Sequence, residues 1–305
     1  MKKTFLSLAT IALLIASCGE EESTRRSRAQ NKPNTEQTGK ANSKETPLID
    51  KETMFGIIKS IPSPLETSDL IKSLGIPFSE RILNSPDKKS KYTTTDKQAL
   101  NLGIYGADLG YTNIYGEKGA SFTYLKAVRQ LANDLKIGQF FDIKTISRMQ
   151  ENANNMDSLL YISQRGFEQM SNYLEKQGRT DVGAQLLLGG WIEGVYLATS
   201  VYKTEPNEKI METIGEQKVA LDEIMVLMDA FRGKRNFQTI IKGFDNLKKV
   251  YDEVEMKYVK EEVELEVAPG VFQKVINSKS TVIISPEQIE TVTETIEELR
   301  ANIID

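Results

Sequence analysis

The stretch of sequence that decides the fold is residues 186–198, which read LLLGGWIEGVYLA. A second stretch, residues 100–111, has the same character and reads LNLGIYGADLGY. Both are apolar and rich in glycine, although glycine costs about 1 kcal/mol relative to alanine inside a helix. The small residues recur at helical spacing, as Gly103, Ala107 and Gly110 in one stretch and Gly190, Gly194 and Ala198 in the other. Such faces let two backbones approach closer than the usual distance of about 8–10 Å. We therefore predict that helices over 95–115 and 181–203 cross in the core.

Apolar residues spaced three and four apart predict further helices on both sides of these two. The predicted ranges are 51–60, 64–74, 120–136, 143–153, 156–177, 206–232, 236–259 and 286–303. Capping signatures mark three starts, at Ser63-Pro64-Leu65-Glu66, Thr95-Asp96-Lys97-Gln98 and Ser285-Pro286-Glu287-Gln288. Short breaks join the four long helices between 156 and 259, which predicts antiparallel neighbours. The expected fold class is mainly all-α, a single antiparallel helical bundle domain over 48–305 with its core at about 95–260.

One segment near the C-terminus departs from the helical pattern. Val263, Leu265 and Val267 alternate with glutamates, and Pro269-Gly270 supplies a turn. Two β-rich runs follow at 271–276 and 281–284. This pattern predicts a small antiparallel hairpin or a three-strand meander at about 262–285.

The N-terminus has the pattern of a secretory leader. Lys2 and Lys3 precede a short apolar run over 5–15, and Ile15-Ala16-Ser17-Cys18 follows. The run is too short to span a bilayer core of roughly 30 Å, so residues 1–17 are predicted to be a signal peptide. The four residues resemble the lipobox of bacterial lipoproteins, which implies that Cys18 becomes the N-terminus and carries acyl chains, palmitate among them. The alternative is an ordinary secretory signal with a chance cysteine.

Residues 18–47 are almost free of apolar side chains and are predicted to form a disordered tether after the lipidated cysteine. Three glutamates at positions 20–22 are similar to the surface-export signal of Bacteroidota-type lipoproteins. Alternatively, they are a solvated charge run on a periplasmic protein. The expected location is the cell envelope, lipid-anchored to the outer membrane on its periplasmic or surface face.

The composition excludes several classes of chemistry. The 305 residues contain no histidine and only one cysteine, which removes His-dependent nucleophile systems, imidazole or thiolate metal sites and disulfides. Carboxylate pairs, oxygen-ligand cations and Ser, Lys or Tyr chemistry remain. The balance of 39 basic against 43 acidic residues argues against a nucleic-acid partner. We predict no metal and no cofactor.

Asp108 and Glu193 are lone acids in apolar surroundings, which raise a carboxyl pKa unless the group is paired or accepts hydrogen bonds. One interpretation is a ligand pocket walled by neighbouring aromatic residues, Tyr105, Tyr111, Trp191 and Tyr196. The other is structural, with each acid bonded to a tyrosine hydroxyl or to a cation such as Arg129.

Two segments, Asn101-Leu102-Gly103-Ile104-Tyr105-Gly106-Ala107-Asp108-Leu109 and Gly189-Gly190-Trp191-Ile192-Glu193-Gly194, resemble those of a group of helical Bacteroidota-type envelope lipoproteins. The resemblance implies a location and a common fold but no activity. We expect a membrane-anchored lipoprotein that acts as a non-enzymatic binding or scaffold component, with an envelope protein as partner. The alternatives are a helical small-molecule receptor and a hydrolase that uses Asp108 and Glu193 as acid and base.

Overall fold

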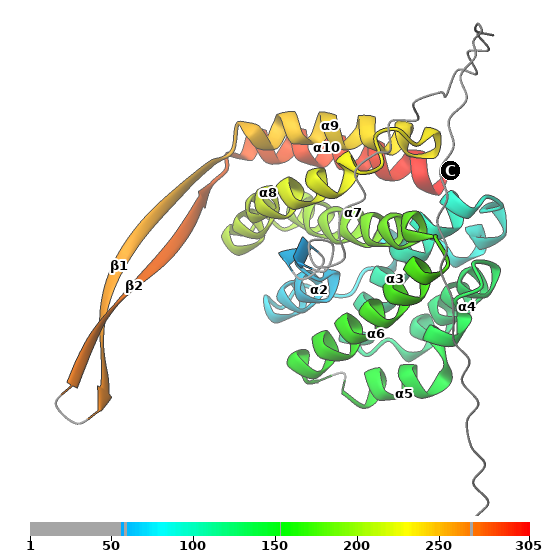
Figure 1. Ribbon diagram of the computed structural model, residues 1–305, viewed down its shortest axis with the longest axis horizontal. Coiled ribbons are helices and arrows are strands. Elements are labelled where there is room, and N and C mark those ends of the chain that lie inside the picture. The colour runs from blue at the N-terminus through cyan, green and yellow to red at the C-terminus, as the bar shows by residue number, and fades with distance from the viewer. Residues whose placement is uncertain (1–55, 58–59, 153, 269–270) are drawn as a thin grey trace, which may run out of the picture. The chain divides into compact units, whose positions relative to one another are not determined.

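The computed structural model describes residues 56–57, 60–152, 154–268 and 271–305 (Figure 1). All of them belong to one compact unit, Glu45–Asp305, which contains the whole of the described hydrophobic core. The predicted leader, Cys18, the tether and most of the predicted helix 51–60 lie outside the described residues.

The described part of the chain is mainly helical, which confirms the all-α class. Its α-helices are α2 (Pro64–Ser73), α3 (Thr95–Tyr115), α4 (Lys118–Asp134), α5 (Ile143–Glu151), α6 (Met156–Lys176), α7 (Thr180–Thr204), α8 (Glu208–Asp229), α9 (Gln238–Asp252) and α10 (Pro286–Ile304). Short 3-10 helices lie between them, namely η1 (Glu80–Ile82), η2 (Pro86–Lys91), η3 (Gly138–Phe141) and η4 (Arg235–Phe237).

Two of the three predicted capping residues are the observed N-caps of their helices. Ser63 and Ser285 form complete capping boxes with Glu66 and Gln288 at α2 and α10. At α3 the prediction was one residue late, because the hydroxyl of Thr94 accepts the Lys97 N–H and Thr95 is already helical. Side chains therefore satisfy the free amides at all three starts.

The C-terminal β segment is a two-stranded antiparallel hairpin, β1 (Glu255–Ala268) and β2 (Val271–Ile283). Pairing begins at Glu255 opposite Ile283, so the predicted helix 236–259 was too long and the three-strand alternative was wrong. The helical spacing continues past Asp252 in the sequence, but the backbone groups of the following residues bond across to β2. The base of the hairpin packs on α8, where Val282 and Ile284 lie against Gly215.

Helix α7 lies at the centre of the bundle (Figure 1). Helices α2, α3, α6, α8 and α10 all pack against it, and α3 makes the most extensive of these contacts. Helices α6 to α9 pack in sequence order as expected, but they do not form a bundle on their own, because the main partner of α7 comes from outside that group.

The α3–α7 crossing is as close as two helices can come. A Cβ atom on Gly103 would overlap the carbonyl oxygen of Leu186 and lie 2.6 Å from the Gly190 nitrogen. A Cβ atom on Gly189 would overlap the carbonyl oxygen of Leu100 and lie 2.8 Å from its carbonyl carbon. Since all of these atoms belong to the backbone, neither helix can accommodate a methyl group without moving away. The predicted crossing is confirmed.

The remaining small residues have a different partner from the one predicted. A Cβ atom on Gly194 would lie 3.4 Å from Pro64, and one on Gly110 would lie 2.5 Å from the Leu65 side chain. These two glycines therefore leave room for the N-terminus of α2. The α3–α7 contact itself requires glycine only at Gly103 and Gly189.

We expect Gly103→Ala to lower the free energy of unfolding by about 1–3 kcal/mol, because the new methyl group would push the backbones of α3 and α7 apart. Gly106→Ala is the matched control on the same helix, since a Cβ atom there meets nothing within 4 Å. It should raise stability by up to about 1 kcal/mol through helix propensity. Urea unfolding of both variants tests the contact, and a Gly103→Ala variant as stable as the wild type would contradict it.

Candidate functional site

The close crossing brings the two predicted acids together in the core. Asp108 of α3 and Glu193 of α7 are both completely buried. Their carboxyl groups lie within hydrogen-bonding reach of each other, and the charge of Glu193 acts on Asp108.

Glu193 is held by a cation that the sequence analysis did not identify. Arg300 of α10 donates from Nε to Glu193 Oε2 at 2.5 Å and from Nη2 to Oε1 at 2.7 Å. Its guanidinium also lies 3.9 Å from the ring centroid of Tyr196. The suggested partner Arg129 is instead exposed. The sequence did indicate that Arg300 is buried. It lies between Ile296 and Ile303 at helical spacing, on the apolar stripe of its helix.

Asp108 holds its proton more tightly than an ordinary aspartic acid, because its pKa is raised. Burial first, and then the negative charge of Glu193, raise the pKa of Asp108 well above its usual value, while Arg300 acts in the opposite direction. Asp108 Oδ2 accepts the Asn84 N–H at 3.2 Å, and no described residue offers a hydrogen bond to Oδ1. A protonated Asp108 can donate to the Glu193 carboxylate, which is paired with Arg300, so that the cluster carries no net buried charge.

The predicted aromatic residues do not wall a pocket around these acids. Tyr105 donates its hydroxyl to the Ser85 carbonyl at 2.8 Å, and Tyr111 accepts the Ser79 N–H at 3.2 Å. Both rings therefore fix the segment between α2 and α3. Both carboxyl groups are completely buried, and neither acid is among the residues that line the cavity described next.

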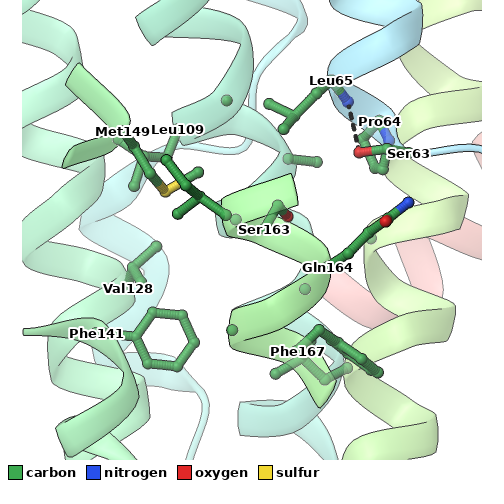
Figure 2. A pocket seen from close by; sticks show the side chains of 18 of the residues that line it. Ser63, Pro64, Leu65, Leu109, Val128, Phe141, Met149, Ser163, Gln164 and Phe167 are labelled. Carbon is green, nitrogen blue, oxygen red and sulfur yellow. Dashed lines mark hydrogen bonds between the residues drawn. The ribbon is translucent and has the colours of Figure 1, made fainter. Parts of the chain in front are cut away.

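Trp191 alone among these predicted residues borders a cavity, which lies elsewhere in the fold. The cavity has a volume of about 260 Å³ and is enclosed by α2, α3, α4, η3, α5, α6 and α7. Figure 2 shows Leu109, Val128, Phe141, Met149 and Phe167 converging on it. The other large apolar side chains of its lining are Ile61, Leu65, Leu102, Leu125, Phe140, Ile146, Leu159, Ile162, Met170, Leu186 and Leu187. No charged side chain occurs among the described residues of the lining.

Glycines keep this space open. The cavity is bordered by Gly103, Gly106 and Gly110 of α3, Gly190 of α7 and Gly166 of α6. A Cβ atom on Gly106 or Gly166 would meet no atom within 4 Å, so packing does not require a glycine at either position. A residue that favours the helix more than glycine does would therefore be accommodated at each position without a clash. The stripe predicted from the sequence, Gly103, Ala107 and Gly110, did not include Gly106 or Gly166.

The lining also offers polar groups that the protein leaves free. The side chains of Asn113, Ser163 and Gln164 make no hydrogen bond with any described residue. Gln164 and Gly106 are exposed, which makes the cavity reachable from solvent. A largely apolar cavity with a few polar groups is the usual form of a small-molecule site.

Neither a metal centre nor a membrane span is found in the part of the chain that the structure describes. No group of three or more His, Cys, Asp or Glu side chains is placed there to hold a metal ion. No helix within the same residues combines the length and apolar character needed to cross a bilayer. No family model, curated protein or solved structure matches the chain.

The raised pKa of Asp108 predicts how stability depends on pH. An unfolded aspartate titrates near pH ~3.9, and the folded protein keeps its proton to a higher pH. Above about pH 4 the folded state therefore binds more protons, and its free energy of unfolding falls by up to about 1.4 kcal/mol per pH unit until Asp108 ionises. Asp108→Asn mimics the protonated acid and should lack this decline, so its advantage in urea unfolding should grow between pH 4.5 and pH 8.

Glu193→Gln separates the charge of the cluster from its packing. This variant should lose stability, because Arg300 loses its charged partner. Its pH-dependent decline should be weaker than that of the wild type, because burial still raises the pKa of Asp108 but the negative charge of Glu193 no longer does. Equal pH slopes for wild type and Asp108→Asn would contradict the assignment of the proton to Asp108.

Proposed function

We propose that this protein is a non-enzymatic binding component of the cell envelope, and that its ligand is a small apolar molecule held in the cavity between α3, α6 and α7. The observation that carries the proposal is an uncharged cavity of about 260 Å³ bordered by glycines that packing does not require. For comparison, an apolar cavity of about 150 Å³ is enough to bind benzene.

The two alternative roles have less support. A hydrolase would need Asp108 and Glu193 to reach a substrate, but both are completely buried and Glu193 is paired with Arg300. A purely structural scaffold has no use for Gly106 and Gly166, which weaken two helices while leaving an apolar space unfilled.

The location and the partners are part of the proposal and rest on the sequence. The lipobox-like Ile15-Ala16-Ser17-Cys18 contains the only cysteine of the chain. Acyl chains on Cys18 would hold the protein at the outer membrane, on the periplasmic or the surface face. An envelope protein that delivers or receives the ligand is the expected partner, and the excess of acidic residues argues against nucleic acid.

Dye binding to the Glu45–Asp305 unit tests the cavity. Trp191 is the only tryptophan of the chain and borders the cavity, so energy transfer from it to the uncharged dye 1-naphthylamine, whose two fused rings match the size of the cavity, reports dye bound nearby. We expect saturable quenching in the wild type. Gly166→Leu should weaken it at least tenfold, a loss of about 1.4 kcal/mol, because the new side chain lies on the same face of α6 as Ile162 and Met170.

Gly119→Leu is the matched control for this substitution. Gly119 also lies in a helix with open space at its Cβ position, but it does not border the cavity. Neither variant should lower the melting temperature, because leucine favours a helix more than glycine does. Equal dye binding by the two variants, or none by the wild type, would refute the proposal.

The anchor is tested on the full chain. Wild-type protein should incorporate labelled palmitate and sediment with membranes, whereas Cys18→Ser should do neither. Membrane association of Cys18→Ser equal to that of the wild type would show that acyl chains on Cys18 do not hold the protein there.

A further inference from the structure

The cavity also specifies the charge of its ligand, an inference that rests on the proposed function. A charged group loses several kcal/mol of hydration when it is buried without a counter-ion. The described lining contains neither a basic nor an acidic side chain. It therefore offers no counter-ion to a carboxylate, a phosphate or an ammonium group.

Two helix N-termini border the cavity, and both are already occupied by the protein's own carboxylates. At α2, Glu66 Oε2 accepts the Ser63 N–H at 2.7 Å, and Ser63 and Pro64 line the cavity. At α5, Asp142 Oδ1 accepts the Thr145 N–H at 2.7 Å, and Thr145 lines the cavity. Helix N-termini otherwise attract anions. Because Glu66 and Asp142 contribute negative charge there, an anionic ligand would be repelled at both places.

The free polar groups fit an uncharged head. The Ser163 hydroxyl and the amides of Asn113 and Gln164 can each donate and accept hydrogen bonds. Figure 2 shows Ser163 and Gln164 on α6. Since the lining is largely apolar and its free polar side chains are few, the cavity suits a molecule that carries a small polar group on an apolar body.

The volume limits the size of the apolar part. If about 150 Å³ holds the six carbons of benzene, then the cavity holds about ten non-hydrogen atoms by proportion. This space suits one hydrocarbon chain and is too small for a helix of a partner protein, whose diameter with side chains is about 10–12 Å.

We infer that the cavity binds an uncharged single-chain amphiphile of about ten carbons, whose hydroxyl, amide or ester head bonds to Ser163, Asn113 or Gln164. Fatty acids and alkyl ammonium ions should bind more weakly, because a charge buried in the cavity would have no counter-ion in the described lining.

Competition for the dye site on the Glu45–Asp305 unit tests this class. Decanol, decanoate and decylammonium have the same chain length and are compared at pH 8 and below their micellar concentrations, with Trp191 energy transfer as the signal. Decanol should displace the dye at a concentration at least tenfold below that of either ion. Decanoate or decylammonium that competes as well as decanol would overturn the inference, although dye binding itself would still support the cavity as a binding site.

Conservative variants test whether the capping acids cause the weaker binding of decanoate relative to decanol. Glu66→Gln and Asp142→Asn keep the capping hydrogen bonds but remove the charge. Each should improve decanoate binding about two- to fivefold and leave decanol binding unchanged. Glu208→Gln is the matched control, because Glu208 lies in the first turn of α8, which does not border the cavity. A decanoate affinity that responds no more to Glu66→Gln and Asp142→Asn than to the control would show that the capping acids do not select the ligand.

Discussion

The backbone contact between α3 and α7 leaves no room for one methyl group, and the rest of the core is arranged around it. At Gly103 and Gly189 the atoms of one helix backbone touch those of the other. Such a contact gains dispersion energy over a large area, but it accepts no other residue at these two positions. It also fixes the rotation of each helix, because only one face of α3 and one face of α7 can approach so closely.

That rotation decides where the two acids go. With the glycines between the helices, Glu193 is paired with Arg300 of α10, and the charges of both residues act on the neighbouring Asp108. Removing any one member leaves a buried charge or an unpaired acceptor, which is costly inside a protein. The cluster therefore ties the C-terminal helix to the central pair, and buried polar contacts such as Asn101 Nδ2 to the Ile303 carbonyl at 3.0 Å reinforce the same junction.

The shortage of side chains along α3 also borders the cavity. Gly110 belongs to the predicted stripe, and the Leu65 side chain fills its Cβ position, whereas Gly106 lies beside the stripe and has open space there. Gly166 of α6 also lines the cavity and has open space at its Cβ position. Glycines of α3 thus allow close helix packing at Gly103 and leave a cavity near Gly106. In the proposed function, the capping acids of α2 and α5 make this cavity favour an uncharged ligand.

The sequence by itself determined the local structure: the start of α2 at Ser63, the pairing of two glycine-rich helices, and the burial of Asp108 and Glu193. These follow from capping, propensity and periodicity, which act over a few residues. Only the tertiary structure decided that Arg300, 107 residues from Glu193, completes the acid cluster. It likewise decided that the stripe faces α2 and a cavity, and that pairing with β2 ends α9 early. Periodicity shows which face of a helix is buried, but the partner of that face depends on how every other helix packs.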